Sequence, residues 1–329
     1  MSLRIIKAGV LDSIQDSGRY GWQYLGINPT GAMDKFAAKV VNLLVGNDPD
    51  EAVIEMHFPS SIFLFEQPAM IAISGADFPA NINGEPIPSS HAFIVNKNVL
   101  LQFQQPHRGA RIYLSVKGGF KIEEWLGSCS THLKAMVGGL KGRGLRKNDQ
   151  LFFREKNDFS SLLGEKEFII LPGKADLNWE DNNEKEVLIL PGHEWERLAE
   201  EAKESFVMTS FVITNQSDRM GYRLNNIPLP MLSNEEVVSS AVSFGTIQLL
   251  PDGRLIILMA DHQTTGGYPR LAHIITAHHS KVAQMKAGDK IYFRFTDQQT
   301  AENLLIKQHQ HLQQLQTACK FRLEEFLKR

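Results

Sequence analysis

A β-hairpin is predicted by residues 246–259, which read TIQLLPDGRLIILM. Two apolar runs flank Pro251-Asp252-Gly253, and these three residue types favour a tight turn. The second run leads into ADHQTTGGYP at residues 260–269, where a carboxylate, an imidazole, an amide and two hydroxyls precede two glycines. Glycines let backbone N–H groups approach a ligand closely, so this loop is a candidate site. A polar turn that only caps a hairpin would have the same local sequence.

The rest of the chain also favours strands over helices. Apolar runs at residues 62–65, 70–73, 93–95, 100–103 and 111–116 are separated by Gly, Pro or Asn, as in a barrel or sandwich. Residues 291–295, IYFRF, alternate with period two and predict a closing strand.

Three helices are expected. Asp34 is the predicted N-cap of a helix over residues 35–45, and Gly46 and Asn47 end it. Residues 194–205 predict a second amphipathic helix. Residues 298–328 predict a third, which would serve as a packing or subunit-contact helix or lie solvated on the surface. We therefore expect a mostly β protein with a few helices, of the β or α+β class.

Two halves are expected, because 329 residues exceed one average domain. FIILPG at residues 168–173 is echoed by VLILPG at residues 187–192, and the polar, acidic residues between them mark a linker. We predict an N-terminal β domain over residues 1–175, a second β domain over residues 186–297 and a helical extension over residues 298–329.

Composition excludes several classes of protein. The chain is 43% hydrophobic and 22% charged, and its formal net charge of -2 gives no electrostatic footprint for nucleic acid or an anionic membrane. Apolar runs are shorter than the roughly 18 residues of a membrane span, and the N-terminus lacks a signal-peptide core. Cys129 and Cys319 lie far apart and are expected to be reduced thiols, so we expect a cytoplasmic protein.

Two further polar clusters lie outside the hairpin. QDSGR at residues 15–19 is soon followed by GAMD at residues 31–34, and SDRMGYRL occupies residues 217–224. Together with residues 260–269, they suggest one polar site assembled from distant parts of the chain. Each cluster alone would more often be a structural ion pair or an Asx turn.

These clusters carry a family resemblance. The chain resembles the KipA family, also called allophanate hydrolase subunit 2 or biotin-dependent carboxyltransferase subdomains A and B, and within it most closely the 5-oxoprolinase members. The matching motifs run in family order: QDSGR (15–19), GAMD (31–34), NLLVGN (42–47), SGAD (74–77), GGF (118–120), SDRMGYRL (217–224), GTIQ (245–248) and DHQTTGGYP (261–269).

The resemblance implies two β-barrel-containing domains, the second cyclophilin-like, with the active region at their junction. It implies a hydrolase of a cyclic amide that is active only in complex: 5-oxoproline is cleaved to glutamate at the expense of ATP, with a KipI-like partner and a LamB/YcsF-like partner. In urea amidolyase the related domain moves a carboxyl group from biotin to urea, which is the alternative activity. The third possibility is a non-enzymatic regulatory role like that of KipA. Each of these three functions is compatible with a homo-oligomer.

The candidate site residues come from these motifs. Arg219 and Arg223 could clamp a carboxylate or phosphate, and on a strand their even spacing would put them on one face. Asp261 or His262 could act as general base, and the hydroxyls and N–H groups that follow could hold an oxyanion. The predicted catalytic residues are Asp218, Arg219, Asp261 and His262. The predicted substrate- or cofactor-binding residues are Gln15, Asp16, Arg19, Asp34, Arg223, Gln263, Thr264, Thr265, Gly266 and Gly267. For Asp16 and Asp34 the structural alternative is to orient an arginine such as Arg19.

Three features depart from the family pattern or from common site motifs. The family usually has Gly-Ser-Arg-Ser-Thr where residues 127–131 read GSCST, and Cys129 is expected to be a small buried residue rather than a reactive thiol. The Gly-rich residues 138–144 do not fit a P-loop, and they form either a phosphate-approaching or a plain loop. His278-His279 and His309-Gln310-His311 lack ligand spacing, so we expect surface histidines and no metal.

Overall fold

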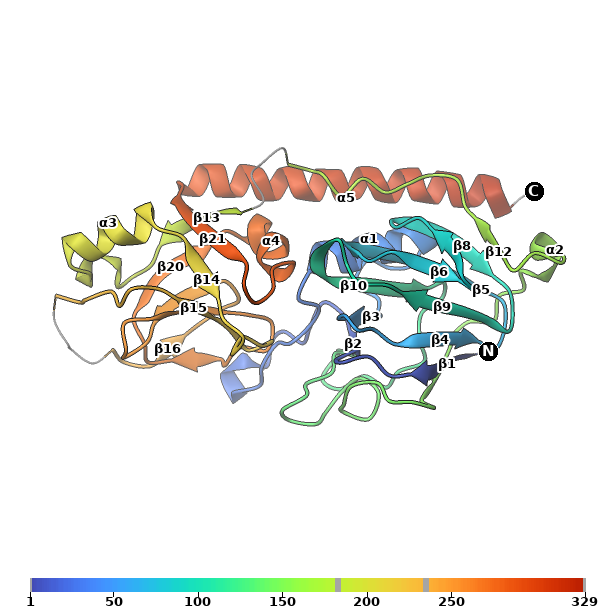
Figure 1. Ribbon diagram of the computed structural model, residues 1–329, viewed down its shortest axis with the longest axis horizontal. Helices are drawn as coiled ribbons and strands as arrows, with labels where there is room; N and C mark the ends of the chain where they lie inside the picture. Colours follow the sequence, from blue (N-terminus) through green and yellow to red (C-terminus); the bar gives the residue numbers. More distant parts are fainter. Residues whose placement is uncertain (1, 181–184, 233–236, 328–329) are drawn as a thin grey trace. The chain divides into compact units, whose positions relative to one another are not determined.

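In the computed structural model, residues 2–180, 185–232 and 237–327 are described, and they divide into two compact units (Figure 1). Unit 1 comprises Met1–Gly18, Asp34–Trp179 and Gln310–Arg329, and unit 2 comprises Arg19–Met33 and Glu180–His309. The division at Trp179 lies inside the predicted linker, whose residues 181–184 are outside the described part of the chain. The short segment Arg19–Met33 belongs to unit 2 although it is flanked by unit 1 in the sequence.

Unit 1 is built on two six-stranded sheets. The first has the order β11-β1-β4-β9-β6-β7 and the second β12-β8-β5-β10-β3-β2. The strands of the first are β1 (Ser2–Lys7), β4 (Ile62–Phe65), β6 (Ala80–Ile82), β7 (Glu85–Ile87), β9 (Val99–Phe103) and β11 (Gln150–Phe152). Those of the second are β2 (Ser13–Gln15), β3 (Val53–Met56), β5 (Ala69–Asp77), β8 (His91–Val95), β10 (Arg108–Val116) and β12 (Phe168–Ile170). The pairing here forms two sheets, where the resemblance had implied a barrel.

Helix α1 (Lys35–Val45) explains why β5 is an apolar run rather than an alternating one. One set of β5 side chains, including Ile71 and Ile73, joins the core that both sheets share. The helix contacts β5, β8 and β10 of the second sheet, so this sheet is buried on both faces (Figure 1). Asp34 caps α1, because its Oδ1 accepts a hydrogen bond of 3.0 Å from the Ala37 N–H, and Gly46 ends the helix in the left-handed conformation at φ 73°. Both ends were predicted. Unit 1 also contains the short helix α2 (Ser160–Leu163).

Unit 2 contains a closed seven-stranded barrel of order β13-β20-β17-β18-β15-β14-β21. Its strands are β13 (Glu186–Pro191), β14 (Phe211–Ile213), β15 (Gly221–Asn225), β17 (Thr246–Leu249), β18 (Leu255–Leu258), β20 (Arg270–Ile274) and β21 (Lys290–Phe295). The predicted hairpin is confirmed as the antiparallel pair β17–β18. The predicted closing strand is confirmed as β21, which pairs with β13 and with β14. A two-stranded sheet pairs β16 (Ser240–Ala241) with β19 (Thr265–Gly266).

The helical part of unit 2 corrects two predictions. The helix expected over residues 194–205 is divided into η2 (Trp195–Arg197) and α3 (Glu200–Met208), because Leu198 and Ala199 are extended and Leu198 bridges to Met231. His278, expected on the surface, is fully buried between η3 (Thr276–His278) and α4 (His279–Ala283). Its Nδ1 accepts a hydrogen bond from the Leu188 N–H, and its Nε2 lies 3.0 Å from Glu180.

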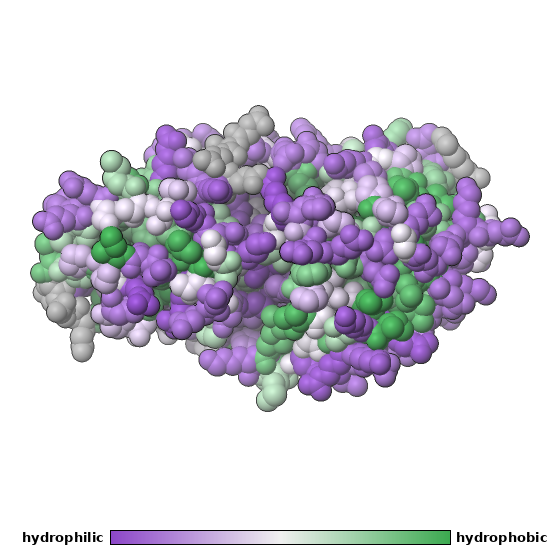
Figure 2. Space-filling model, viewed as in Figure 1, coloured by the Kyte–Doolittle hydropathy of each residue, from purple (hydrophilic) through white to green (hydrophobic). Residues whose placement is uncertain are grey.

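The predicted C-terminal helix is confirmed as α5 (Gln298–Leu327). Its residues up to His309 group with unit 2 and those from Gln310 with unit 1. Another short helix, η1 (Gln23–Leu25), lies in the segment Arg19–Met33. No helix among the described residues is long and apolar enough to cross a membrane. Figure 2 shows that hydrophilic residues predominate on the face in view and that apolar residues form separate groups.

Candidate functional site

Asp218 and Arg219 lie in the turn before β15, and Arg223 lies on the strand itself. Asp218 Oδ1 accepts hydrogen bonds from the backbone N–H groups of Met220 (2.8 Å) and Gly221 (3.2 Å), which makes an Asx turn. Arg219 lies in this turn and is buried, whereas Arg223 lies on β15 and is exposed. The two arginines therefore do not share one strand face, because Arg219 precedes the strand on which the even spacing would apply.

Arg219 forms a buried bidentate ion pair with Asp261. Its Nε lies 3.0 Å from Asp261 Oδ2 and its Nη2 lies 3.1 Å from Asp261 Oδ1. The Nη2 group also donates to the Gly31 carbonyl at 2.6 Å, and Arg219 and Asp261 are 4% and 5% exposed. Each carboxylate oxygen of Asp261 thus accepts a hydrogen bond from Arg219. The geometry favours a structural role for this pair.

The segment Arg19–Met33 is hydrogen-bonded to the loop that carries Asp261. The side-chain amide of Asn28 donates to the Asp261 carbonyl at 2.9 Å and to the His262 carbonyl at 2.7 Å. His262 is buried, and its Nδ1 donates to the Gln263 carbonyl at 2.6 Å. The residues that follow Gly18 thus meet the residues that follow β18.

A pocket of about 530 Å³ opens on the barrel of unit 2, and Asp218 and Gln263, which neighbour Arg219 and His262 in the sequence, line it. Its polar lining comes from Gln216, Asp218, Arg223, Gln248, Asp252, Gln263 and Tyr268. Asp218, Arg223 and Gln263 were predicted site residues, and all three line it. Hydrogen bonds join none of the described residues to Asp218 Oδ2 or to the guanidinium of Arg223, so a carboxylate and a cation face the same pocket with capacity for a ligand.

Gln248 is the residue in this pocket that the sequence analysis left without a role. It is fully buried, and its Nε2 donates to the Tyr268 carbonyl at 3.3 Å. Its Oε1 has no hydrogen-bond partner among the described residues. A buried acceptor without a donor is costly, so this oxygen would accept an N–H that reached it, although none of it is exposed in the structure. The motif GTIQ at residues 245–248 was a signal that could have identified it.

A side chain at Gly266 would displace the amide of Gln248. A Cβ atom at Gly266 would lie 2.6 Å from Gln248 Nε2, which is closer than a side chain tolerates. Gly266 and Thr265 form β19, and the Thr264 carbonyl accepts a hydrogen bond from the Val242 N–H. Residues 264–266 are therefore partly committed to strand pairing, and the exposed Gly267 follows them.

In unit 1, Asp16 ties the end of β2 to the loop that carries Cys129. Its Oδ1 accepts hydrogen bonds from the hydroxyls of Ser128 (2.7 Å) and Ser130, and its Oδ2 accepts one of 2.5 Å from the Cys129 N–H. Burial, followed by the charge of Asp16, raises the pKa of the Cys129 thiol to about 12, so the thiol is neutral. This arrangement favours the predicted small, inert cysteine.

The remaining predicted residues have clear local partners. Gln15 is fully buried and donates to Ser13 Oγ (2.9 Å) and to the Thr131 carbonyl (3.3 Å). Arg19 belongs to unit 2, is 1% exposed and donates to Thr30 Oγ1 at 2.5 Å. Asp34 caps α1. These contacts place each side chain in the structure of its own unit, and Gln15 Oε1 is a buried acceptor without a hydrogen-bond partner among the described residues.

A second ion pair in unit 2 was missed from the sequence. Arg270 donates to Glu194 from its backbone N–H (2.8 Å) and from its guanidinium (2.8 and 3.1 Å). Burial would raise the pKa of Glu194, but the hydrogen bonds from Arg270 outweigh it and leave that pKa below its usual value. The partners are 76 residues apart, so no local pattern linked them.

The Gly-rich residues 138–144 form a packed turn. A Cβ atom would lie 1.9 Å from Thr131 Oγ1 at Gly139 and 2.0 Å from the Met136 carbonyl oxygen at Gly142. Arg143 pairs with Asp149 through two hydrogen bonds of 2.7 and 2.9 Å. The glycines are thus explained by packing, and the one arginine of the loop is engaged. Among the described residues, no group of three or more His, Cys, Asp or Glu is arranged to hold a metal.

Comparison with known proteins agrees with this architecture. The chain is 34% identical to the 5-oxoprolinase C subunit of Escherichia coli over 88% of its length and 90% of that protein's. It is 33% identical to the corresponding 5-oxoprolinase C subunit of Haemophilus influenzae over 92% of its length and 94% of that protein's. The crystal structure of K. lactis urea amidolyase superposes with a TM-score of 0.86 at 25% identity, over 95% of this chain and 20% of that one. Residues 25–295 match the model of the carboxyltransferase domain, subdomains A and B, and the chain belongs to this family.

Proposed function

We propose that this chain is the C-type subunit of an ATP-dependent 5-oxoprolinase, which cleaves 5-oxoproline to glutamate together with a KipI-like partner and a LamB/YcsF-like partner. The similarity to two subunits named for that enzyme, over about nine-tenths of each chain, supports the assignment. The observation that carries it is the pocket of unit 2, which Asp218, Arg223 and Gln248 line together.

The substrate fits these two groups chemically. 5-Oxoproline carries a carboxylate and a lactam N–H on one five-membered ring. Arg223 can bind the carboxylate through charge-assisted hydrogen bonds, and Gln248 Oε1 can accept the lactam N–H. A ring held at both points presents its carbonyl carbon in one orientation, which is what a hydrolytic step requires.

The proton acceptor is assigned to Asp218. Of the two predicted carboxylates, Asp261 has both oxygens bound by Arg219, whereas Asp218 lines the pocket and uses only Oδ1 in its turn. Asp218 Oδ2 can therefore take a proton from the attacking water without breaking a buried ion pair. Asp261 and Arg219 then act as positioning residues that hold the loop beside the pocket.

The nucleotide is assigned to a partner protein. Backbone N–H groups and free cations are what bind phosphates, and Arg143 of the Gly-rich turn is already paired with Asp149. In this turn Lys141 is the cation without an ion pair to a described residue, and the turn does not fit a P-loop, so the proposal places the phosphates on a partner. Activity would accordingly require the complex.

Carboxyl transfer from biotin to urea or a related amide is the second candidate. It is favoured by the structural match to K. lactis urea amidolyase. Gln248 could accept an N–H of urea as well as that of a lactam. Arg223 distinguishes the two, because urea has no carboxylate for it to bind.

The test is glutamate release from 5-oxoproline and ATP by the chain co-expressed with its partner subunits. Arg223→Ala should raise KM by about 10- to 100-fold, since a charged hydrogen bond contributes about 1.5–3 kcal/mol. Arg294→Ala is the matched control, because Arg294 is an exposed arginine on β21 of the same barrel and does not line the pocket. No glutamate from the wild-type complex would overturn the proposal, and biotin-dependent carboxylation of urea would then be measured.

A further inference from the structure

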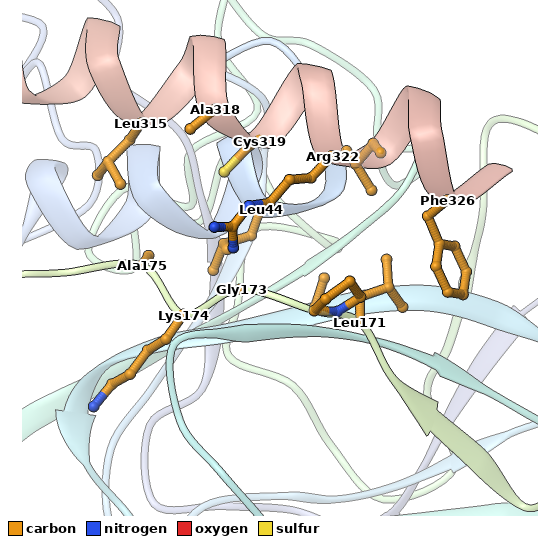
Figure 3. A pocket seen from close by; sticks show the side chains of 13 residues that line it. Leu44, Leu171, Gly173, Lys174, Ala175, Leu315, Ala318, Cys319, Arg322 and Phe326 are labelled. Atoms are coloured by element: carbon orange, nitrogen blue, oxygen red, sulfur yellow. The ribbon is translucent and has the colours of Figure 1, made fainter. Parts of the chain in front are cut away.

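The C-terminal half of α5 forms one wall of a second pocket, which lies wholly within unit 1 (Figure 3). Its volume is about 110 Å³. The helix contributes Leu315, Cys319, Arg322 and Phe326, and the opposite walls come from Leu44 of α1, Ala92 of β8 and residues 171–175. Helix α5 starts after the last residue matched by the carboxyltransferase family model, so this pocket depends on an element outside that match.

The walls of this pocket are apolar and firmly packed. Leu44, Ala92, Leu171, Ala175 and Leu323 are each no more than 8% exposed. An apolar cavity of about 150 Å³ is known to hold benzene, so a space of this size suits a body no larger than a small ring or a short alkyl chain. A polar ligand of the same size would lose its hydration here without compensation.

One cation lies at the edge of the apolar space. Figure 3 shows the side chain of Arg322 reaching from α5 toward Leu44 and Gly173, whereas Lys174 points away. Arg322 is an exposed residue, hydrogen bonds and ion pairs join it to none of the described residues, and its guanidinium lies close to the backbone at Gly173. A Cβ atom at Gly173 would lie 1.8 Å from Arg322 Nη1, and Gly173 has φ 104°. Glycine at this position therefore lets the guanidinium lie against the backbone.

The thiol of Cys319 completes the apolar wall. Burial raises the pKa of Cys319, so it is a neutral thiol near pH 7 and contributes no charge. The guanidinium of Arg322 is then the charged group that faces the space, and it favours an anion. A carboxylate matches the planar fork of arginine with two parallel hydrogen bonds.

We propose that this pocket binds a small apolar carboxylate, whose hydrocarbon body lies among Leu44, Leu171 and Leu323 and whose carboxylate pairs with Arg322. The site is separate from the pocket of unit 2 and does not depend on the proposed 5-oxoprolinase activity.

The test is isothermal titration of the full-length chain with benzoate and with benzamide, which share a ring but differ in charge. Benzoate should bind in the millimolar range or tighter, since a ligand of this size gains roughly 0.3–0.5 kcal/mol per heavy atom, and benzamide should bind about tenfold more weakly. Arg322→Gln should reduce benzoate to the level of benzamide. Lys320→Gln, an exposed cation on the same helix outside the pocket, should leave binding unchanged.

A second measurement covers the case in which a variant perturbs α5. In a Cys129→Ser background, Cys319 is the single thiol, and benzoate should slow its alkylation by iodoacetamide severalfold while benzamide should not. Filling the space with Cys319→Leu should abolish benzoate binding in the titration. Equal binding of benzoate and benzamide, an unchanged affinity in Arg322→Gln, or no binding by the wild-type chain would each overturn the proposal.

Discussion

Arg219 shows how one buried residue connects three separate parts of unit 2. Its guanidinium bonds Asp261 and the Gly31 carbonyl, and its own carbonyl accepts the Asp261 N–H at 2.8 Å. Arg219→Ala should lower the free energy of unfolding by about 3–5 kcal/mol, because it leaves the Asp261 carboxylate buried without its partner. Urea denaturation followed by circular dichroism measures this loss.

The control for Arg219 is the exposed pair of Arg254 and Asp252. Their side chains are more than half exposed and lie 3.6 Å apart. Arg254→Ala should change the free energy of unfolding by less than about 1 kcal/mol. Similar losses in Arg219→Ala and Arg254→Ala would contradict the structural role assigned to the buried pair.

Asp12 should make the stability of the chain depend on pH. Burial is the main reason that the pKa of its carboxyl is raised from 3.8 to about 6. The folded state therefore holds this proton more tightly than the unfolded state. The stabilisation that the Asp12 carboxyl contributes is fully present below about pH 4 and is lost as the pH rises through 6. The free energy of unfolding should fall by roughly 3 kcal/mol over this range.

Asp12→Asn tests this pH dependence. Asparagine cannot titrate, so the slope of unfolding free energy between pH 4 and pH 7 should flatten. The variant should also be less stable throughout, because Asp12 accepts from the N–H groups of His57 (3.1 Å) and Ser61 (2.6 Å) through different oxygens and an amide has only one acceptor oxygen. An unchanged slope relative to the wild type, with Asp252→Asn as the surface control, would contradict the assignment.

Single residues could be predicted from the sequence only where their partners are local. Asp34 was identified as an N-cap because it accepts a hydrogen bond three residues away. The partner of Asp261 lies 42 residues away, so the sequence suggested a catalytic base where the structure has an ion pair. Gln248 was missed for a similar reason, since an acceptor without a donor is a property of the folded surroundings.

At the scale of elements, the hairpin β17–β18 was predictable and the helix expected over residues 194–205 was not. The hairpin is specified by its own turn residues and by the apolar runs that flank this turn. Residues 194–205 have a helical pattern, but Glu194 is held by Arg270 and Leu198 bridges to Met231. These tertiary contacts outweigh the intrinsic helical preference, which is a weak determinant for a short segment.

The loop that carries Cys129 should depend on Asp16 for its order. Asp16→Ala removes the acceptor for Ser128 Oγ, Ser130 Oγ and the Cys129 N–H, together with a negative charge that contributes to the high pKa of the thiol. Alkylation of Cys129 by iodoacetamide at pH 8 should accelerate by about tenfold or more. Mass spectrometry of peptides resolves the two thiols.

Cys319 serves as the internal reference for the Asp16 experiment. It lies on α5, in the wall of the apolar pocket of unit 1, and not on the loop that carries Cys129. Its alkylation rate should be the same in wild type and Asp16→Ala. Equal acceleration at both thiols would indicate general unfolding of unit 1 rather than release of one loop.

At the scale of the whole molecule, the two-part organisation was predictable but the membership of the parts was not. Composition marked the linker near residue 180, whereas nothing in residues 19–33 showed that they belong with the second unit. That assignment depends on contacts such as those of Asn28 with the carbonyls of Asp261 and His262, which are remote in the sequence.

The proposed function predicts that the purified chain alone does not release glutamate from 5-oxoproline and ATP. The reason is that the proposal assigns the substrate to the pocket of unit 2 and the nucleotide to a partner subunit. Turnover should appear when the partner subunits are added, and a coupled glutamate assay measures it. Robust turnover by the single chain would contradict a shared active site.

The placement of residues 19–33 also has a consequence for biosynthesis. This segment leaves the ribosome early, but its partners Arg219 and Asp261 follow about 200 residues later. At a translation rate of roughly 5–20 residues per second, the partners of Asn28 and Gly31 are synthesised on the order of 10–50 seconds after these two residues. Their hydrogen bonds cannot form before then. Folding of the barrel unit must therefore finish after its last strand is made, and a nascent chain halted before residue 261 would leave the early segment accessible to a co-translational protease.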